Sequence, residues 1–316
     1  MSDLLRYEEQ LPDLSGLRDP LLIAGFGGAW GTSAAEALRE LVEHWEAEPL
    51  ASVDPQTLFD FTVRRPHVRI VDRDGAEAAV RAIDWPANEF YLARPEGAER
   101  DLVLLVGSEP QLRWREFTDA VVAAMERFGV SESLMLGAYR AATPHSRPLP
   151  VQLYSRDAQL AARFGLVPEA WSYEGPAGIT TPLAVACEER GWSSSSLLAA
   201  APFYVSVEPH PFAARALIQA LGHGLNAEVD VAVYDEQIAE LYEEAEDARG
   251  RSDEFGRFID TLELNYDELH PALDSIDTSE APTAPELVED VESFLRQLRD
   301  SEDSEHPPSE TASGSS

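Results

Sequence analysis

Apolar residues along the first two-thirds of the chain fall into short runs, separated by stretches in which they are spaced three or four apart. A short continuous apolar run is typical of a strand buried on both faces, whereas the wider spacing marks one face of a helix. Helices and strands that alternate in this way predict an α/β fold, a mostly parallel sheet with helices on both faces. Strands are expected at 20–27, 66–72, 88–93, 101–107, 133–138, 151–155 and 197–205, and helices at about 32–44, 113–128, 157–164, 180–190 and 211–223. The serines at 193–196 are expected to form a polar loop before the last strand.

The last third of the chain has a different pattern. Three apolar stripes at helical spacing run through residues 231–242, 255–266 and 287–298, with breaks at 248–253 and 282–285. Each predicted helix is acidic on its other side, so its apolar side must be covered. We therefore expect an α/β core at 1–228 and a helical appendage at 229–300 packed on that core. A helical arm used for self-association is the alternative, and the Ser-, Glu-, Pro- and Gly-rich residues 301–316 are expected to be a disordered tail.

Charge and composition exclude several kinds of chemistry. The 316 residues include no lysine, so all 24 Lys-or-Arg positions are arginine. A Walker-type phosphate loop and Schiff-base catalysis through a lysine amine are therefore excluded. The formal net charge of −34 argues against nucleic acid and anionic membranes as partners, because their phosphates would be repelled. Residues 228–316 hold 27 acids and 5 arginines, so the arginines able to form an anion site lie mainly before residue 228.

The remaining composition bounds the compartment and the cofactors. The single cysteine, Cys187, lies on an apolar helical stretch and is expected to be buried and unreactive. The sequence shows neither a signal peptide nor an apolar run long enough to span a membrane. No spacing typical of a metal site or cofactor loop was found. We therefore expect a soluble cytoplasmic protein without a metal or cofactor.

Candidate chemistry lies where predicted parallel strands end, because ligands of open α/β sheets bind beyond the carboxyl ends of the strands. Glu109 follows the 101–107 strand, His145 and Arg147 follow the 133–138 strand between two prolines, and Tyr204 ends the last strand. Each has a plainer interpretation as a turn or loop residue. Asp60, Arg64 and Arg65 form either an internal ion-pair cluster or an anion-binding rim. We expect His145 and Arg147 to contact Glu109 or residues 60–65 in one concave site.

Several segments in order resemble the actinobacterial branch of the proteasome assembly chaperone 2 family. They are Phe59–Pro66, Gly107–Pro110 with Trp114 and Phe117, Pro144–Pro148, and 284–296, so the likeness spans about 20–300. The resemblance implies an α/β sandwich similar to purine nucleoside phosphorylases and related hydrolases, with added C-terminal helices, and an assembly role. This sequence departs from the branch at the turn 27–32, which lacks an Asn-Asp pair, and at Phe203, where a histidine is expected.

Two functions follow from these observations. The first is a non-enzymatic factor that binds protein partners and forms a homo-oligomer, with no catalytic residues. The alternative is a phosphorylase- or hydrolase-like enzyme acting on a small anionic substrate at Asp60, Arg64, Glu109, His145 and Arg147, with His145 and Glu109 as its catalytic groups. The residues expected to bind in either case are Asp60, Arg64, Arg65, Glu109, Trp114, His145, Arg147 and Tyr204.

Overall fold

The computed structural model describes residues 4–29, 31–71 and 79–270. The chain divides into two compact units, residues 1–263 and 264–316. The first unit contains the whole sheet, and only residues 264–270 of the second are described. The third predicted C-terminal helix and the predicted tail therefore lie outside the described residues.

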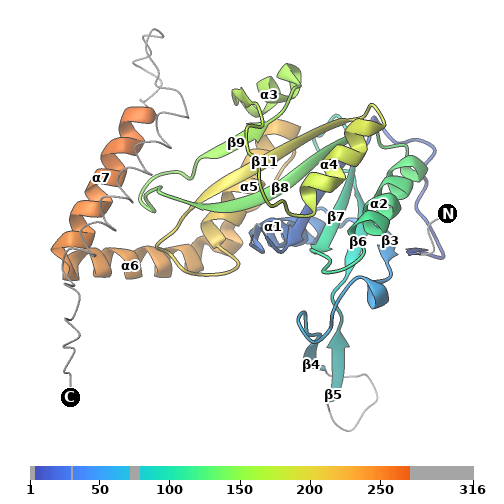
Figure 1. Ribbon diagram of the computed structural model, residues 1–316, viewed down its shortest axis with the longest axis horizontal. Coiled ribbons are helices and arrows are strands. Elements are labelled where there is room, and N and C mark those ends of the chain that lie inside the picture. Colours follow the sequence, from blue (N-terminus) through green and yellow to red (C-terminus); the bar gives the residue numbers. More distant parts are fainter. Residues whose placement is uncertain (1–3, 30, 72–78, 271–316) are drawn as a thin grey trace, which may run out of the picture. The chain divides into compact units, whose positions relative to one another are not determined.

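Nine strands within the described residues form one mixed sheet (Figure 1). Their bounds are β1 Leu5–Tyr7, β2 Leu21–Gly27, β3 Glu48–Val53, β6 Asn88–Ala93, β7 Leu102–Ser108, β8 Glu132–Ala141, β9 Val151–Tyr154, β10 Pro168–Glu169 and β11 Ser193–Pro202. The strand order is β1-β3-β6-β7-β2-β8-β11-β9-β10. The four central strands, β7, β2, β8 and β11, are parallel. The predicted α/β class is confirmed, and the carboxyl ends of these central strands share one edge of the sheet.

Helices cover both faces of the sheet, as predicted (Figure 1). On one face lie α1 Ser33–His44, α3 Ala158–Phe164 and α5 Pro211–Leu225, and on the other α2 Trp114–Phe128 and α4 Thr180–Glu189. Alternate residues of β2 explain its continuous apolar sequence: Leu22 and Ala24 pack under α2 and α4, while Leu21 and Ile23 pack under α1 and α5. Cys187 is fully buried beneath α4, as expected.

The predicted strand at 66–72 forms outside the main sheet. Residues His67–Val71 are β4, which pairs antiparallel with β5, Val80–Asp84, in a separate two-stranded ribbon. The alternation of polar and apolar residues correctly indicated a strand, but it could not show which strand would pair with it. The ribbon lies between β3 and β6 in the sequence, so it projects from that side of the sheet (Figure 1).

The expectation of a polar loop at 193–196 is wrong. These four serines begin β11 and pair with β8, from Ser193 opposite Glu132 to Ser196 opposite Met135. Their hydroxyls find partners inside the sheet: Ser133 Oγ donates to Ser194 Oγ at 2.9 Å, and the Ser155 and Ser195 hydroxyls are 2.8 Å apart. A polar strand interior is stable here because its side chains hydrogen-bond to one another.

Two long helices follow the sheet, with the break between them where it was predicted. α6 is Asp235–Arg251 and α7 is Asp253–Leu269, separated by Ser252. Ahead of α6, Tyr234 is buried in the core beneath α1 and α5, with Ile238 packed against that core. No helix in the described part of the chain has both the length and the apolar character needed to span a membrane.

Candidate functional site

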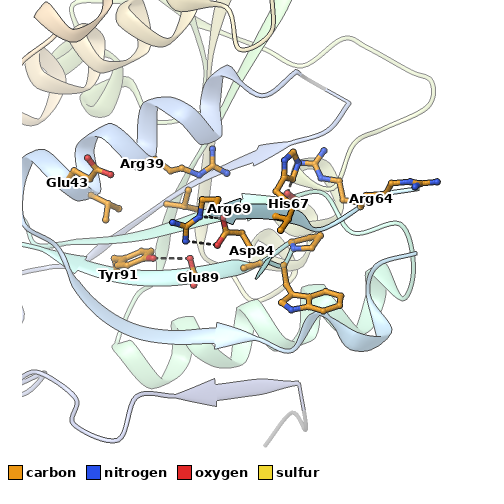
Figure 2. A pocket seen from close by; sticks show the side chains of 17 residues that line it. Arg39, Glu43, Arg64, His67, Arg69, Asp84, Glu89 and Tyr91 are labelled. Carbon is orange, nitrogen blue, oxygen red and sulfur yellow. Dashed lines mark hydrogen bonds and ion pairs between the residues drawn. The ribbon is translucent and has the colours of Figure 1, made fainter. Parts of the chain in front are cut away.

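A pocket of about 640 Å³ opens beside the ribbon, between the helix α1 and the strands β6 and β7 (Figure 2). Arg39 and Glu43 face it from α1, and Glu89 and Tyr91 line it from β6. The ribbon and the residues just before it supply most of the cationic side chains. These are Arg64, Arg65, His67 and Arg69. We call this the arginine pocket.

The cationic side chains of the arginine pocket are held at different strengths. Arg64 Nη2 donates to Ser108 Oγ at 2.8 Å, which ties the loop before the ribbon to the end of β7. Both Nε and Nη2 of Arg69 donate to the carboxylate of Asp84 across the ribbon, and this hydrogen bond holds the pKa of Asp84 below its usual range. Arg65 makes no hydrogen bond or ion pair within the part of the chain that the structure describes. The pocket can therefore accept an acidic group from another molecule.

Asp60 supports the loop that leads into this pocket. Its Oδ1 accepts hydrogen bonds from the backbone N–H of Thr62 at 2.8 Å and from the Thr62 hydroxyl at 2.6 Å. These bonds hold the pKa of Asp60 below its usual range. Asp60 is absent from the residues lining the pocket, whereas Arg64 and Arg65 line it. The interpretation of residues 64–65 as an anion-binding rim therefore has geometric support, and Asp60 shapes the loop.

Glu109 joins two turns at the carboxyl edge of the sheet. Its Oε2 accepts the N–H of Ala29 at 2.8 Å, and its Oε1 accepts the N–H of Ile179 at 2.7 Å. Ile179 is the residue before α4, so the carboxylate lies at the N-terminus of that helix, where negative charge is favoured. Gly28 makes room for Glu109, because a Cβ on Gly28 would lie 2.4 Å from the Glu109 Cβ. Trp114, at the start of α2, donates to the Pro110 carbonyl and packs on the core.

His145 and Tyr204 meet α6 rather than Glu109. The Tyr204 hydroxyl accepts the backbone N–H of His145 at 2.7 Å and also lies 2.7 Å from its Nδ1. Nε2 of His145 is 3.2 Å from Glu246 Oε1 on α6. The His145 side chain is fully buried, and burial lowers its pKa despite the neighbouring Glu246. Burial also raises the pKa of Tyr204 to about 12.

Residues of α7 complete this group, which we call the His145 cluster. Ser146 Oγ donates to Glu263 Oε1, and Arg147 Nη1 lies 3.9 Å from the same oxygen. Arg249 on α6 bridges Glu246 and Glu263 at 3.4 and 3.2 Å. The Phe255 and Phe258 rings pack edge-on against Tyr204, at 5.5 and 6.2 Å between ring centroids. The cluster fastens the loops after β8 and β11 to the two C-terminal helices.

The structure corrects the expectation of one rim site. Arg64 and Arg65 line the arginine pocket, Glu109 holds two backbone turns, and His145 with Tyr204 joins α6. The contacts of His145 go to α6 and to the loop after β11, and none found among the described residues joins it to Glu109. These strands do end on one edge, but each loop turns toward the helix that covers it. Among the described residues, no group of three or more His, Cys, Asp or Glu side chains is placed to hold a metal ion.

Sequence reasoning missed the second strand of the ribbon and the apolar residues that it exposes. Residues 80–85 alternate in a strand-like way, which was the available signal. Trp85 packs edge-on against Phe61 with ring centroids 4.9 Å apart. Val68, Ile70 and Ile83 lie largely in solvent on the same ribbon. This exposed apolar surface was invisible in the sequence because the strands were assigned to a buried sheet.

The fold and these surfaces define an α/β protein with a mixed sheet, a projecting ribbon and C-terminal helices fastened to the sheet's carboxyl edge. The model of the PAC2 family matches residues 22–249, and the chain belongs to this family. The resemblance found in the sequence is therefore confirmed. A comparison with curated proteins gave no significant match.

Solved structures agree with this assignment. A PAC2 family protein from Streptomyces avermitilis is 36% identical, with 76% of this chain and 99% of that chain covered and a TM-score of 0.64. A proteasome-assembly chaperone homologue from Mycobacterium tuberculosis is 33% identical over 76% of this chain and 99% of its own, with a TM-score of 0.63. The archaeal proteasome activator PbaB from Pyrococcus furiosus is 19% identical over 78% of this chain and 99% of its own; its TM-score of 0.59 shows a shared fold.

Proposed function

We propose that this chain is a non-enzymatic cytoplasmic factor that binds protein partners during assembly of a larger complex and that also self-associates. The observation that carries the proposal is the exposed apolar face of the β4–β5 ribbon. Apolar side chains gathered on a projecting element are typical of a protein-binding surface. The proteasome-assembly chaperone homologue of M. tuberculosis, which is 33% identical, makes proteasome subunits the first partners to test.

The enzymatic alternative has less support from the site. Glu109 already accepts two backbone N–H groups, one at each oxygen, so its carboxylate is committed to structure. The side chain of His145 is fully buried against Tyr204 and Glu246. A general acid or base must reach the substrate within hydrogen-bond distance. Neither candidate meets that condition in this structure.

A reconstitution experiment tests the proposal. Proteasome α- and β-subunits from the same organism are mixed with and without the purified chain, and formation of the core particle is followed by native mass spectrometry. We expect the chain to accelerate assembly and to appear in complexes with incomplete particles. Ile70→Asp on the ribbon should weaken this effect, whereas Val185→Asp, an exposed apolar residue on α4, should preserve it. No complex with either subunit and no change in assembly rate would contradict the proposal.

A further inference from the structure

The ribbon has one face that is apolar with a single cation. In the strand register, Val68 lies opposite Ile83 and Ile70 lies opposite Arg81. Opposed residues of an antiparallel pair share a face, so these four side chains form one surface, with Trp85 following in the same alternation. Val68, Ile70 and Ile83 are 55–70% exposed. A two-stranded hairpin with an open apolar face is marginally stable in water, so this surface, which we call the ribbon face, requires a cover.

A second exposed apolar surface lies at the far end of the strand order. β10 is the last strand of the sheet, and the segment around it exposes Val167, Trp171 and Tyr173 at 55–84%. Trp171 stacks on Tyr154 of β9, with ring centroids 4.2 Å apart and planes at 17°, so its outer face is held toward solvent. Glu169 and Glu174 are the only charged residues between 166 and 176. We call Val167, Glu169, Trp171, Tyr173 and Glu174 the edge patch.

The two surfaces are complementary in charge. The ribbon face carries Arg81, and the cations of the arginine pocket lie at the base of the ribbon. The edge patch carries two carboxylates and no cation. A contact between two edge patches would bring four carboxylates together in a chain of net charge −34, and a contact between two ribbon faces would oppose Arg81 to itself. Only the mixed pairing joins apolar surface to apolar surface with opposite charges beside it.

We propose that the ribbon face of one copy docks on the edge patch of a second copy of this chain. The inference rests on the self-association included in the proposed function and names the surfaces that make it. The ribbon leaves the chain between β3 and β6, near the β1 end of the strand order, whereas the edge patch adjoins β10 at the other end. Each copy in a contact therefore keeps one unused surface of each kind. Such head-to-tail contacts close into a ring or extend into a chain of copies.

Sedimentation velocity on the purified full chain tests this pairing without any partner protein. We expect the wild type to sediment well above the 34.7 kDa of one chain. Ile70→Asp should disable the ribbon face, and Val167→Arg should place a cation in the edge patch opposite Arg81. Each variant alone should sediment as a monomer. Val185→Asp on α4 is the matched control and should keep the wild-type mass.

Mixing the two disabled variants separates this proposal from other arrangements. Ile70→Asp keeps an intact edge patch and Val167→Arg keeps an intact ribbon face, so an equimolar mixture should form a dimer that cannot grow further. A variant that failed to fold could not restore the dimer, so recovery also shows that both variants are folded. A monomeric wild type, variants that keep the wild-type mass, or a mixture that stays monomeric would each overturn the proposal. Failure in the reconstitution assay with normal self-association would instead reject the assembly function alone.

Discussion

At the scale of single residues, Glu109 is a polar side chain that organises backbone instead of performing chemistry. It fixes the turn after β2 and the start of α4 with one carboxylate, and Gly28 is the residue that lets it approach so closely. Hydrogen bonds to an ionised group contribute about 1.5–3 kcal/mol each when buried, and less where water competes. The side chain is partly exposed, so the lower end of that range applies to it.

We therefore expect Glu109→Ala to lower the free energy of unfolding by about 2–3 kcal/mol, because two backbone donors lose a charged acceptor. Urea denaturation monitored by circular dichroism measures this change. Glu116→Ala is the matched control, since Glu116 lies on α2 and its ion pair with Arg113 is exposed. It should shift stability by well under about 1 kcal/mol. Equal midpoints for Glu109→Ala and wild type would show that the carboxylate does not hold the turns.

His210, at the N-terminus of α5, gives the chain a pH-dependent stability. Burial, and then the nearby Arg140, lower its pKa to about 4 from an ordinary value of 6.5. The unfolded chain therefore binds a proton at His210 that the folded chain refuses. The contribution to stability is complete above pH 6.5 and is lost as the pH falls toward 4, by about 3 kcal/mol over that window at roughly 1.4 kcal/mol per unit.

His210→Phe keeps a buried ring without a titrating nitrogen. We expect the difference in unfolding free energy between wild type and His210→Phe to change by about 3 kcal/mol between pH 6.5 and pH 4. His44→Gln, which alters an exposed histidine, should run parallel to wild type across the same range. Urea titrations at half-unit pH steps measure all three proteins. A constant difference between His210→Phe and wild type would mean that His210 titrates normally in the folded chain.

At the scale of elements, the sequence predicted what each segment is better than what it touches. The run at 20–27 was a reliable strand because it is apolar at every position that both helix layers cover. The strand at 66–72 was correct as a strand and wrong as part of the sheet, because pairing with β5 depends on a partner and not on local pattern. The serines of β11 failed because their hydrogen bonds run to Ser133 and Ser155, far along the chain.

The candidate site shows the same limit. The segment 144–148 stood out because two prolines restrict it, and the structure does give it a specific set of contacts. The identity of those contacts was not predictable, since His145 and Glu246 are 101 positions apart. A pattern of residue types cannot distinguish a histidine that binds a ligand from one that binds a helix of its own chain. Only the packing of α6 against the loops after β8 and β11 decides this.

The His145 cluster should determine how firmly α6 is held. Tyr204→Phe removes the hydroxyl that accepts the backbone N–H of His145 and leaves the ring contacts with Phe255 in place. We expect the free energy of unfolding to fall by about 1–2 kcal/mol, because a buried donor loses its partner. Hydrogen–deuterium exchange should become faster in α6 before the central strands change.

The matched control for this prediction is Tyr173→Phe. The Tyr173 hydroxyl also donates one hydrogen bond, to the Pro176 carbonyl at 3.0 Å, but the side chain is exposed. Exchange in α6 should be unchanged in this variant. If both variants exchange alike in α6, the hydroxyl of Tyr204 has no part in holding that helix, and the aromatic contacts alone hold it.

At the scale of the whole chain, acidic charge is concentrated where the helices follow the sheet. Residues 228–316 hold 27 acids against 5 arginines, yet the segment that opens this region is apolar on one side and buries Tyr234 in the core. Repulsion among these carboxylates opposes compaction, so apolar burial and the pairing of Arg249 with Glu246 and Glu263 must offset it. The helices therefore belong to the folding unit that contains the sheet, in line with a first compact unit that extends to residue 263.

Truncation tests this view of the chain. A fragment ending at residue 228 loses α6 and α7, so Phe203, Tyr204 and His145 lose the rings and carboxylates that cover them. We expect this fragment to aggregate or to change its assembly state, because water cannot replace those apolar contacts. Light scattering and sedimentation velocity measure both effects. Removal of only the residues after Asp300, a stretch without an apolar stripe, should change neither property. A 1–228 fragment that is soluble, unchanged in mass and as stable as the full chain would make the helices an independent module, and their apolar stripes would then be the surface to test for partner binding.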